Sequence, residues 1–166
     1  MLKTIINYLL GLVLAYASQA SAKITPYFAT NNDIGLGSVL FVPGYCTMSH
    51  EDGSFSDLAP AVMYGLGGPA TPGRYAIVAN PNQQISITLL QRDDQGDGIM
   101  FIPQGEVISK TETHTLTAVV AQEIDSGTSR VINIHVGGRL FVLSSIAPGS
   151  NIEFTLVDGI EWSVVP

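Results

Sequence analysis

The stretch Ile132-Asn133-Ile134-His135-Val136 decides the fold class, because apolar and polar residues alternate in it without a break. Successive side chains of an extended strand point to opposite faces, so this pattern gives one apolar and one polar face. The same alternation recurs over residues 85–89, 115–120 and 152–156. One buried face and one wetted face are typical of antiparallel sheets.

Turn-forming residues separate the alternating stretches. Gly, Pro and Asn interrupt regular structure, and eight such breaks predict about nine strands. No stretch after residue 22 has the apolar stripe of a helix. The sequence therefore predicts an all-β, antiparallel fold, either a sandwich or a barrel, and the unequal lengths of the strands favour the β-sandwich. The breaks are Pro43-Gly44, Pro72-Gly73, Asn80-Pro81-Asn82, Gly96-Asp97-Gly98, Ser126-Gly127, Gly137-Gly138, Pro148-Gly149 and Asp158-Gly159.

The apolar faces of these strands predict the hydrophobic core, and the polar faces predict the solvated surface. By alternation, His135 falls beside Asn133 on a polar face and is interpreted as a solvated strand residue. The predicted core residues are Ile85, Ile87, Leu89, Ile132, Ile134, Leu140, Val142, Ile152, Phe154 and Leu156.

Residues 1–22 have the three parts of a secretory signal peptide: a basic start, an apolar middle and small residues at Ala20 and Ala22. The apolar run is shorter than the roughly 20 residues that cross a bilayer, although a retained anchor is the alternative. We expect cleavage after Ala22, which leaves residues 23–166 as a single domain. The mature protein is then exported to the periplasm, the cell surface or the medium, and has no membrane span.

The mature chain is acidic. Of 7 basic and 14 acidic residues, only Lys3 precedes the expected cleavage site, so 6 basic residues face 14 acidic ones, a net charge near −8. The basic residues are scattered, which argues against a nucleic-acid partner.

Residues capable of chemistry are spread along the chain. The histidines His50, His114 and His135 do not have metal-ligand spacing. Cys46 is the only cysteine, so we expect no internal disulfide and interpret it as a buried apolar residue, with a cross-link between copies as the alternative. No motif of a hydrolase or phosphate-binding loop is complete. We therefore expect no enzymatic activity, no metal and no cofactor.

The acidic stretch that begins at Asp93 partly imitates a calcium-binding loop. Asp93, Gln95 and Asp97 match its opening positions, but Gln104 stands where the loop needs a bidentate Glu. We interpret the stretch as an exposed acidic turn, with calcium binding as the alternative.

Three ordered segments resemble the bacterial secreted family known as domain of unknown function 4402. They are Asp33-Ile34-Gly35-Leu36-Gly37-Ser38, the stretch from Pro72 to Leu89, and Val136-Gly137-Gly138-Arg139-Leu140 followed by Pro148-Gly149. The resemblance covers nearly the whole mature chain. It implies an immunoglobulin-like, pilin-related sandwich without catalytic residues.

Two functions remain in view, besides a less favoured secreted hydrolase. The first is a fimbrial or pilin-like structural subunit that self-associates or joins related subunits. The second is a monomeric periplasmic or surface binding module for a ligand that the sequence does not identify. In the first case residues 23–32 form a strand that completes the sheet of a neighbour. The alternative is that this segment pairs within its own domain or frays, as chain termini often do. Ile24, Pro26 and Phe28 would then project to one side as the exchanged side chains.

Overall fold

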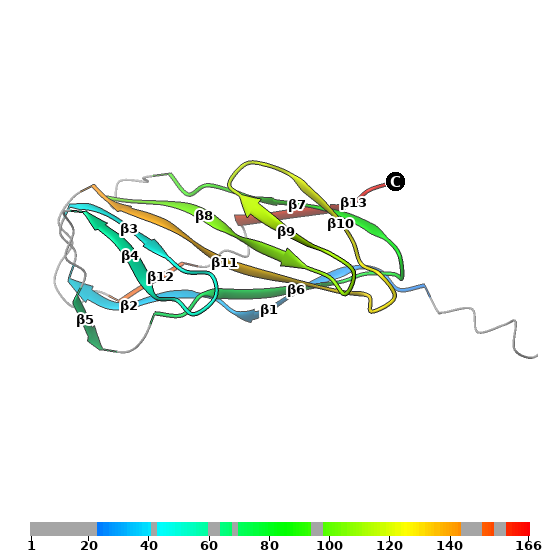
Figure 1. Ribbon diagram of the computed structural model, residues 1–166, viewed down its shortest axis with the longest axis horizontal. Helices are drawn as coiled ribbons and strands as arrows, with labels where there is room; N and C mark the ends of the chain where they lie inside the picture. Colours follow the sequence, from blue (N-terminus) through cyan, green and yellow to red (C-terminus); the bar gives the residue numbers. More distant parts are fainter. Residues whose placement is uncertain are drawn as a thin grey trace, which may run out of the picture.

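The computed structural model describes residues 23–40, 43–59, 64–67, 70–93, 98–143, 151–154 and 159–166, and every element in these ranges is a β-strand. All ladders between the strands are antiparallel (Figure 1). The predicted all-β class is confirmed. The strands are β1 (Tyr27–Asn32), β2 (Ile34–Leu40), β3 (Gly44–Met48), β4 (Phe55–Ala59), β5 (Tyr64–Gly67), β6 (Gly73–Val78), β7 (Gln84–Leu89), β8 (Ile99–Ile108), β9 (Thr113–Thr117), β10 (Gln122–Asp125), β11 (Val131–Val142), β12 (Asn151–Phe154) and β13 (Ile160–Val164).

Strand β11 organises the largest sheet, which is called the main sheet here. One edge of β11 pairs with β6 over its first half and with β3 over its second half, while β8 runs along the other edge. The main sheet continues outward to β1 beyond β6, to β4 beyond β3 and to β9 beyond β8. A second sheet has the order β10-β7-β13, and a third has the order β12-β2-β5.

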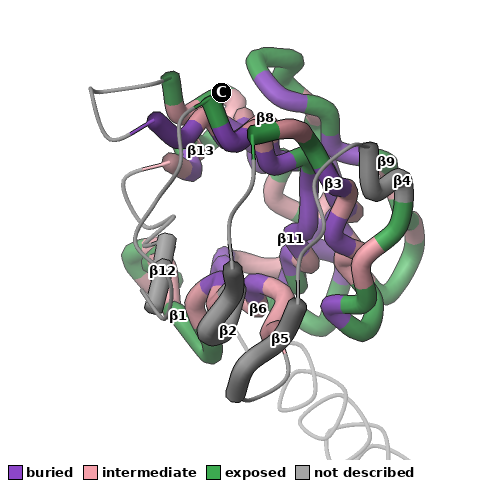
Figure 2. Tube along the Cα trace, turned by 90° about the vertical axis from the view of Figure 1, so that its left-hand side faces the viewer, coloured by how far each residue is buried: buried purple, intermediate pink, exposed green. Residues whose placement is uncertain are grey.

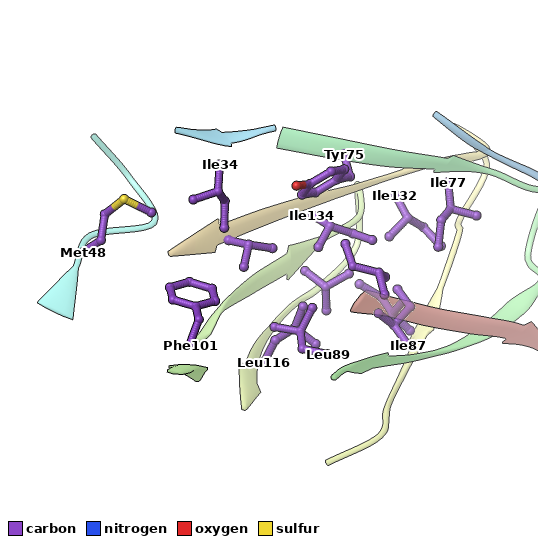
Figure 3. Packing of buried hydrophobic residues seen from close by; sticks show 14 of the residues in the cluster. Ile34, Met48, Tyr75, Ile77, Ile87, Leu89, Phe101, Leu116, Ile132 and Ile134 are labelled. Atoms are coloured by element: carbon purple, nitrogen blue, oxygen red, sulfur yellow. The ribbon is translucent and has the colours of Figure 1, made fainter. Parts of the chain in front are cut away.

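The core lies between the main sheet and the β10-β7-β13 sheet (Figure 2). Figure 3 shows Ile77, Ile132 and Ile134 of the main sheet facing Ile87 and Leu89 of β7. Burying each such side chain stabilises the fold by roughly 1.5–3 kcal/mol. The prediction is confirmed for Ile85, Ile87, Leu89, Ile132, Ile134, Leu140 and Val142, which are all buried. The side chains of Ile152, Phe154 and Leu156 lie outside the described part of the chain.

The predicted turn at Gly137-Gly138 is wrong, because both residues lie inside β11. Here β11 changes its partner from β6 to β3. A Cβ on Gly137 would clash with the carbonyl oxygen of Met48, and one on Gly138 would clash with that of Ile102. The two glycines therefore permit close approach of neighbouring backbones, which is the other common reason for glycine in a strand.

The described chain also has more strands than the nine predicted. The N-terminal stretch is divided at Asp33, where β1 in the main sheet gives way to β2 in the third sheet. The stretch over residues 115–120 ends early, because β9 stops at Thr117 and Val120 is exposed. Sheet changes of this kind do not require Gly or Pro, so turn signals alone underestimate the number of strands.

Candidate functional site at the edge strand

Strand β1 is an edge strand of the main sheet. Its residues pair with β6 from Tyr27 opposite Val78 to Asn32 opposite Arg74, with an irregularity between Thr30 and Asn32. Among the described residues, β6 is its only ladder partner. The outer edge of β1 therefore presents backbone N–H and C=O groups that another strand can bind.

The inner face of β1 contributes to the core through Phe28. Its ring packs on that of Tyr75, with 5.6 Å between the ring centroids and 27° between the ring planes. Tyr27, on the opposite face, is 54% exposed. Ile24, Pro26, Phe28 and Ala29 are all half-buried, whereas Thr25 and Tyr27 are exposed. In this structure the segment pairs within its own domain.

A single residue, Asp33, separates β1 from β2. A hydrogen bond of 3.3 Å, which the Tyr75 hydroxyl donates to Asp33 Oδ1, ties it to the main sheet. Gly35 and Thr71 then bond each other's backbone in both directions, which fixes the start of β2. The connection at Asp33 is therefore the point about which β1 would turn if it left β6.

A second group of side chains lies on the outer face of the main sheet. Arg74, His135 and Glu106 are direct neighbours on three adjacent strands. His135 Nδ1 lies 3.3 Å from Glu106 Oε1, and His50 Nε2 lies 3.9 Å from Glu106 Oε2. Arg74 donates hydrogen bonds of 2.5 Å to the carbonyl oxygens of His50 and Glu51. The group therefore fastens the β3–β4 loop to the sheet.

Electrostatics within this group disfavour a charged His135. Burial lowers the pKa of His135 below its usual value of 6.5, and the Arg74 guanidinium lowers it further. The hydrogen bond and charge of Glu106 oppose both effects, and His50 adds a weak lowering. His135 is thus on the outer face, as predicted, but is half-buried and paired rather than solvated. The sequence gives no signal for the grouping, since 29 residues separate Glu106 from His135.

The remaining sequence candidates are described only in part. Within the described ranges, no group of three or more His, Cys, Asp and Glu side chains could hold a metal ion. Asp93 is exposed and accepts a hydrogen bond of 2.6 Å from Gln91, but Asp97 lies outside the described residues. Cys46 is buried, 1% exposed, and burial raises the pKa of its thiol to about 12. Such a thiol is a poor nucleophile.

Both ends of the described chain lie at one pole of the molecule. A shallow groove of about 470 Å³ is lined there by Lys23, residues 80–84, Val165 and Pro166. Figure 1 shows the C-terminus at the same end as the start of the blue chain that leads into β1. Within the described residues, no helix is long and apolar enough to span a bilayer.

The chain was compared with models of protein families, with curated proteins and with solved structures, and nothing in any of the three matches it. The resemblance to domain of unknown function 4402 therefore stays a prediction.

Proposed function

We propose that the protein is a structural subunit of an exported, surface-associated assembly, in which β1 of one copy replaces β1 of the next. The observation that carries the proposal is the position of β1. It is a short edge strand, it follows the expected signal-peptide cleavage site, and it is joined to the rest of the domain by one residue, Asp33.

Exchange of β1 conserves its interactions. A neighbour's β1 would form the same ladder with β6 and would place the same Phe28 ring on Tyr75. The monomer, in which β1 lies on its own β6, and the assembly, in which β1 lies on the β6 of a neighbour, then contain nearly the same contacts. The protein concentration therefore decides which of the two forms is populated. The proposal needs no ligand, cofactor or reaction.

A disulfide that locks β1 onto its own β6 tests the proposal. Ala29 and Ala76 are directly opposite in the ladder, and directly opposite Cβ atoms lie about 4.5–5.5 Å apart, near the spacing of a disulfide. The double variant Ala29→Cys/Ala76→Cys is made in mature protein that carries Cys46→Ala. We expect it to stay monomeric in sedimentation and electron microscopy when oxidised, and to assemble when reduced.

The two single-cysteine variants are the controls and should assemble in both conditions. Equal assembly of the oxidised and reduced double variant would show that β1 does not exchange. A mature Cys46→Ala protein that is monomeric at all accessible concentrations would favour the monomeric binding module instead.

A further inference from the structure

The pairing of β1 with β6 ends at Tyr27 and Val78, and a proline lies beyond this point in each segment, at Pro26 and Pro81. Continued in the same register, the ladder would place Pro26 opposite Ala79 and Ile24 opposite Pro81. Proline has no N–H to donate. The N–H of Ala79 is also engaged elsewhere, since it bonds the carbonyl oxygen of Arg130 at 2.8 Å. The N–H of Asn80 is engaged as well, by Oε1 of its own turn's Gln83, so no backbone N–H of residues 79–81 binds the chain ahead of Tyr27.

The side chain of Asn80 supplies the missing groups. Its Oδ1 accepts the N–H of Ile24 at 2.7 Å, and its Nδ2 donates to the carbonyl oxygen of Ile24 at 2.9 Å. One primary amide thus satisfies both backbone groups of one residue, as a neighbouring strand would. Since both contacts are to the backbone, they recognise an extended chain rather than the isoleucine side chain.

The amide of Asn80 is held in place by its own turn. Gln83 Oε1 accepts hydrogen bonds from the Asn80 backbone N–H at 3.0 Å and from Nδ2 at 3.2 Å. The hydroxyl of Ser126 donates to the Asn80 carbonyl oxygen at 2.6 Å and accepts the Gln83 N–H at 3.0 Å. Ser126 is fully buried, 0% exposed. This support orients the amide, so that little further ordering is needed when a backbone binds.

We propose that Asn80 forms a binding site for an extended peptide backbone, which Ile24 of the same chain occupies in the monomer and Ile24 of a second copy occupies in the assembly. The second occupant rests on the proposed strand exchange, whereas the first does not. In the monomer the site controls how readily the segment ahead of β1 opens.

Hydrogen exchange of the Ile24 amide in mature, monomeric protein tests the first occupant. Removal of two hydrogen bonds in Asn80→Ala should speed this exchange about ten- to a hundredfold. Asn80→Asp keeps the shape and the acceptor but loses the donor, so it should also speed exchange even if the alanine variant folds poorly. Gln84→Ala, which removes an exposed amide at the start of β7 next to this turn, should change the rate less than about twofold.

An Ile24 exchange rate that is unchanged in both Asn80 variants would overturn the proposal. The proposal would also be overturned if the exchange rate of the Ile24 amide rose no more than that of the Ile77 amide. Exchange of Ile77, in β6, reports destabilisation of the whole domain.

Mixing of two differently labelled populations of assembled protein tests the second occupant. Because the monomer and the assembly both contain the Asn80 contact, Asn80→Ala should speed the mixing of subunits while the assembled fraction stays nearly constant. Faster Ile24 exchange with an unchanged rate of mixing would support the site within one chain and overturn its second occupant. That result would count against strand exchange and not against the site itself.

Discussion

Val119 has a backbone conformation that its side chain disfavours. Its φ is 57°, in the left-handed region, and such values are rare for β-branched residues. Its N–H donates to the carbonyl oxygen of Leu89 at 2.7 Å, which ties the end of β9 to β7 and holds the strained conformation. The Val119 side chain adds little hydrophobic stabilisation to offset this strain, since it is 69% exposed.

Replacement of Val119 by glycine should therefore stabilise the protein. Relief of the left-handed strain, about 1–2 kcal/mol, exceeds the entropic cost of glycine, about 0.5–1 kcal/mol. We expect Val119→Gly to raise the free energy of unfolding in urea by about 0.5–1 kcal/mol. Val120→Gly is the matched control and should lower it. Equal losses in the two variants would show that Val119 is not strained.

The buried thiol of Cys46 gives a second residue-level prediction. Because burial raises its pKa to about 12, Cys46 should react with a thiol reagent at pH 8 only after the protein unfolds. Cys46→Ala should fold and assemble normally, whereas Cys46→Ser should lose about 1–3 kcal/mol of stability by burying a hydroxyl. Rapid labelling of the native protein would contradict the buried position and would restore the cross-link between copies as an interpretation.

At the scale of elements, the β3–β4 loop is fastened to the main sheet by groups that respond to pH. Arg74, Glu106 and His50 all face His135. Burial, Arg74 and His50 lower the pKa of His135 in the folded state, and Glu106 opposes this lowering without cancelling it. The fold therefore prefers neutral His135. Its contribution to stability is present above the ordinary histidine pKa of about 6.5 and is lost as the pH falls below that value.

We expect the free energy of unfolding to be lower at pH 5.5 than at pH 7.5. His135→Gln removes the titrating group and should reduce this difference, while His114→Gln on β9 should leave it in place. Chemical denaturation at the two pH values measures the effect. A difference that is as large in His135→Gln as in the unchanged protein would assign the acid sensitivity to other groups.

The elements also show where prediction from the sequence succeeds. Alternation places β7 and the first half of β11 correctly, because a sheet with one buried face imposes that pattern on each strand separately. The glycine pair at Gly137-Gly138 misleads, because glycine serves close packing as well as turns. The Glu106 and Asn80 contacts were not predicted, since they join segments that only the folded chain brings together: 56 residues separate Asn80 from Ile24.

For the whole molecule, the structure has the architecture that the strand pattern predicts, and its β1 edge is compatible with assembly. Both described chain ends lie at the same pole of the molecule as Asn80. If the segment ahead of β1 is released from Asn80, it therefore lies beside the groove lined by Val165 and Pro166. The formal net charge of −7 opposes indiscriminate association of copies, so in the proposed assembly a specific strand contact would have to provide the attraction.

The central claim is that β1 of one copy lies on β6 of another. Its most direct test mixes two mature proteins that both carry Cys46→Ala, one with Ala29→Cys and the other with Ala76→Cys, and oxidises them after assembly. Ala29 and Ala76 are opposite in the ladder, so exchange of β1 between copies predicts a disulfide between the two proteins. It would be seen as a dimer on a non-reducing gel of the assembled fraction. Val131→Cys, one strand farther away on β11, replaces Ala76→Cys as the control and should give no such dimer. An assembled fraction without the Ala29–Ala76 cross-link, or with an equally strong cross-link in the control, would contradict the exchange of β1 between copies.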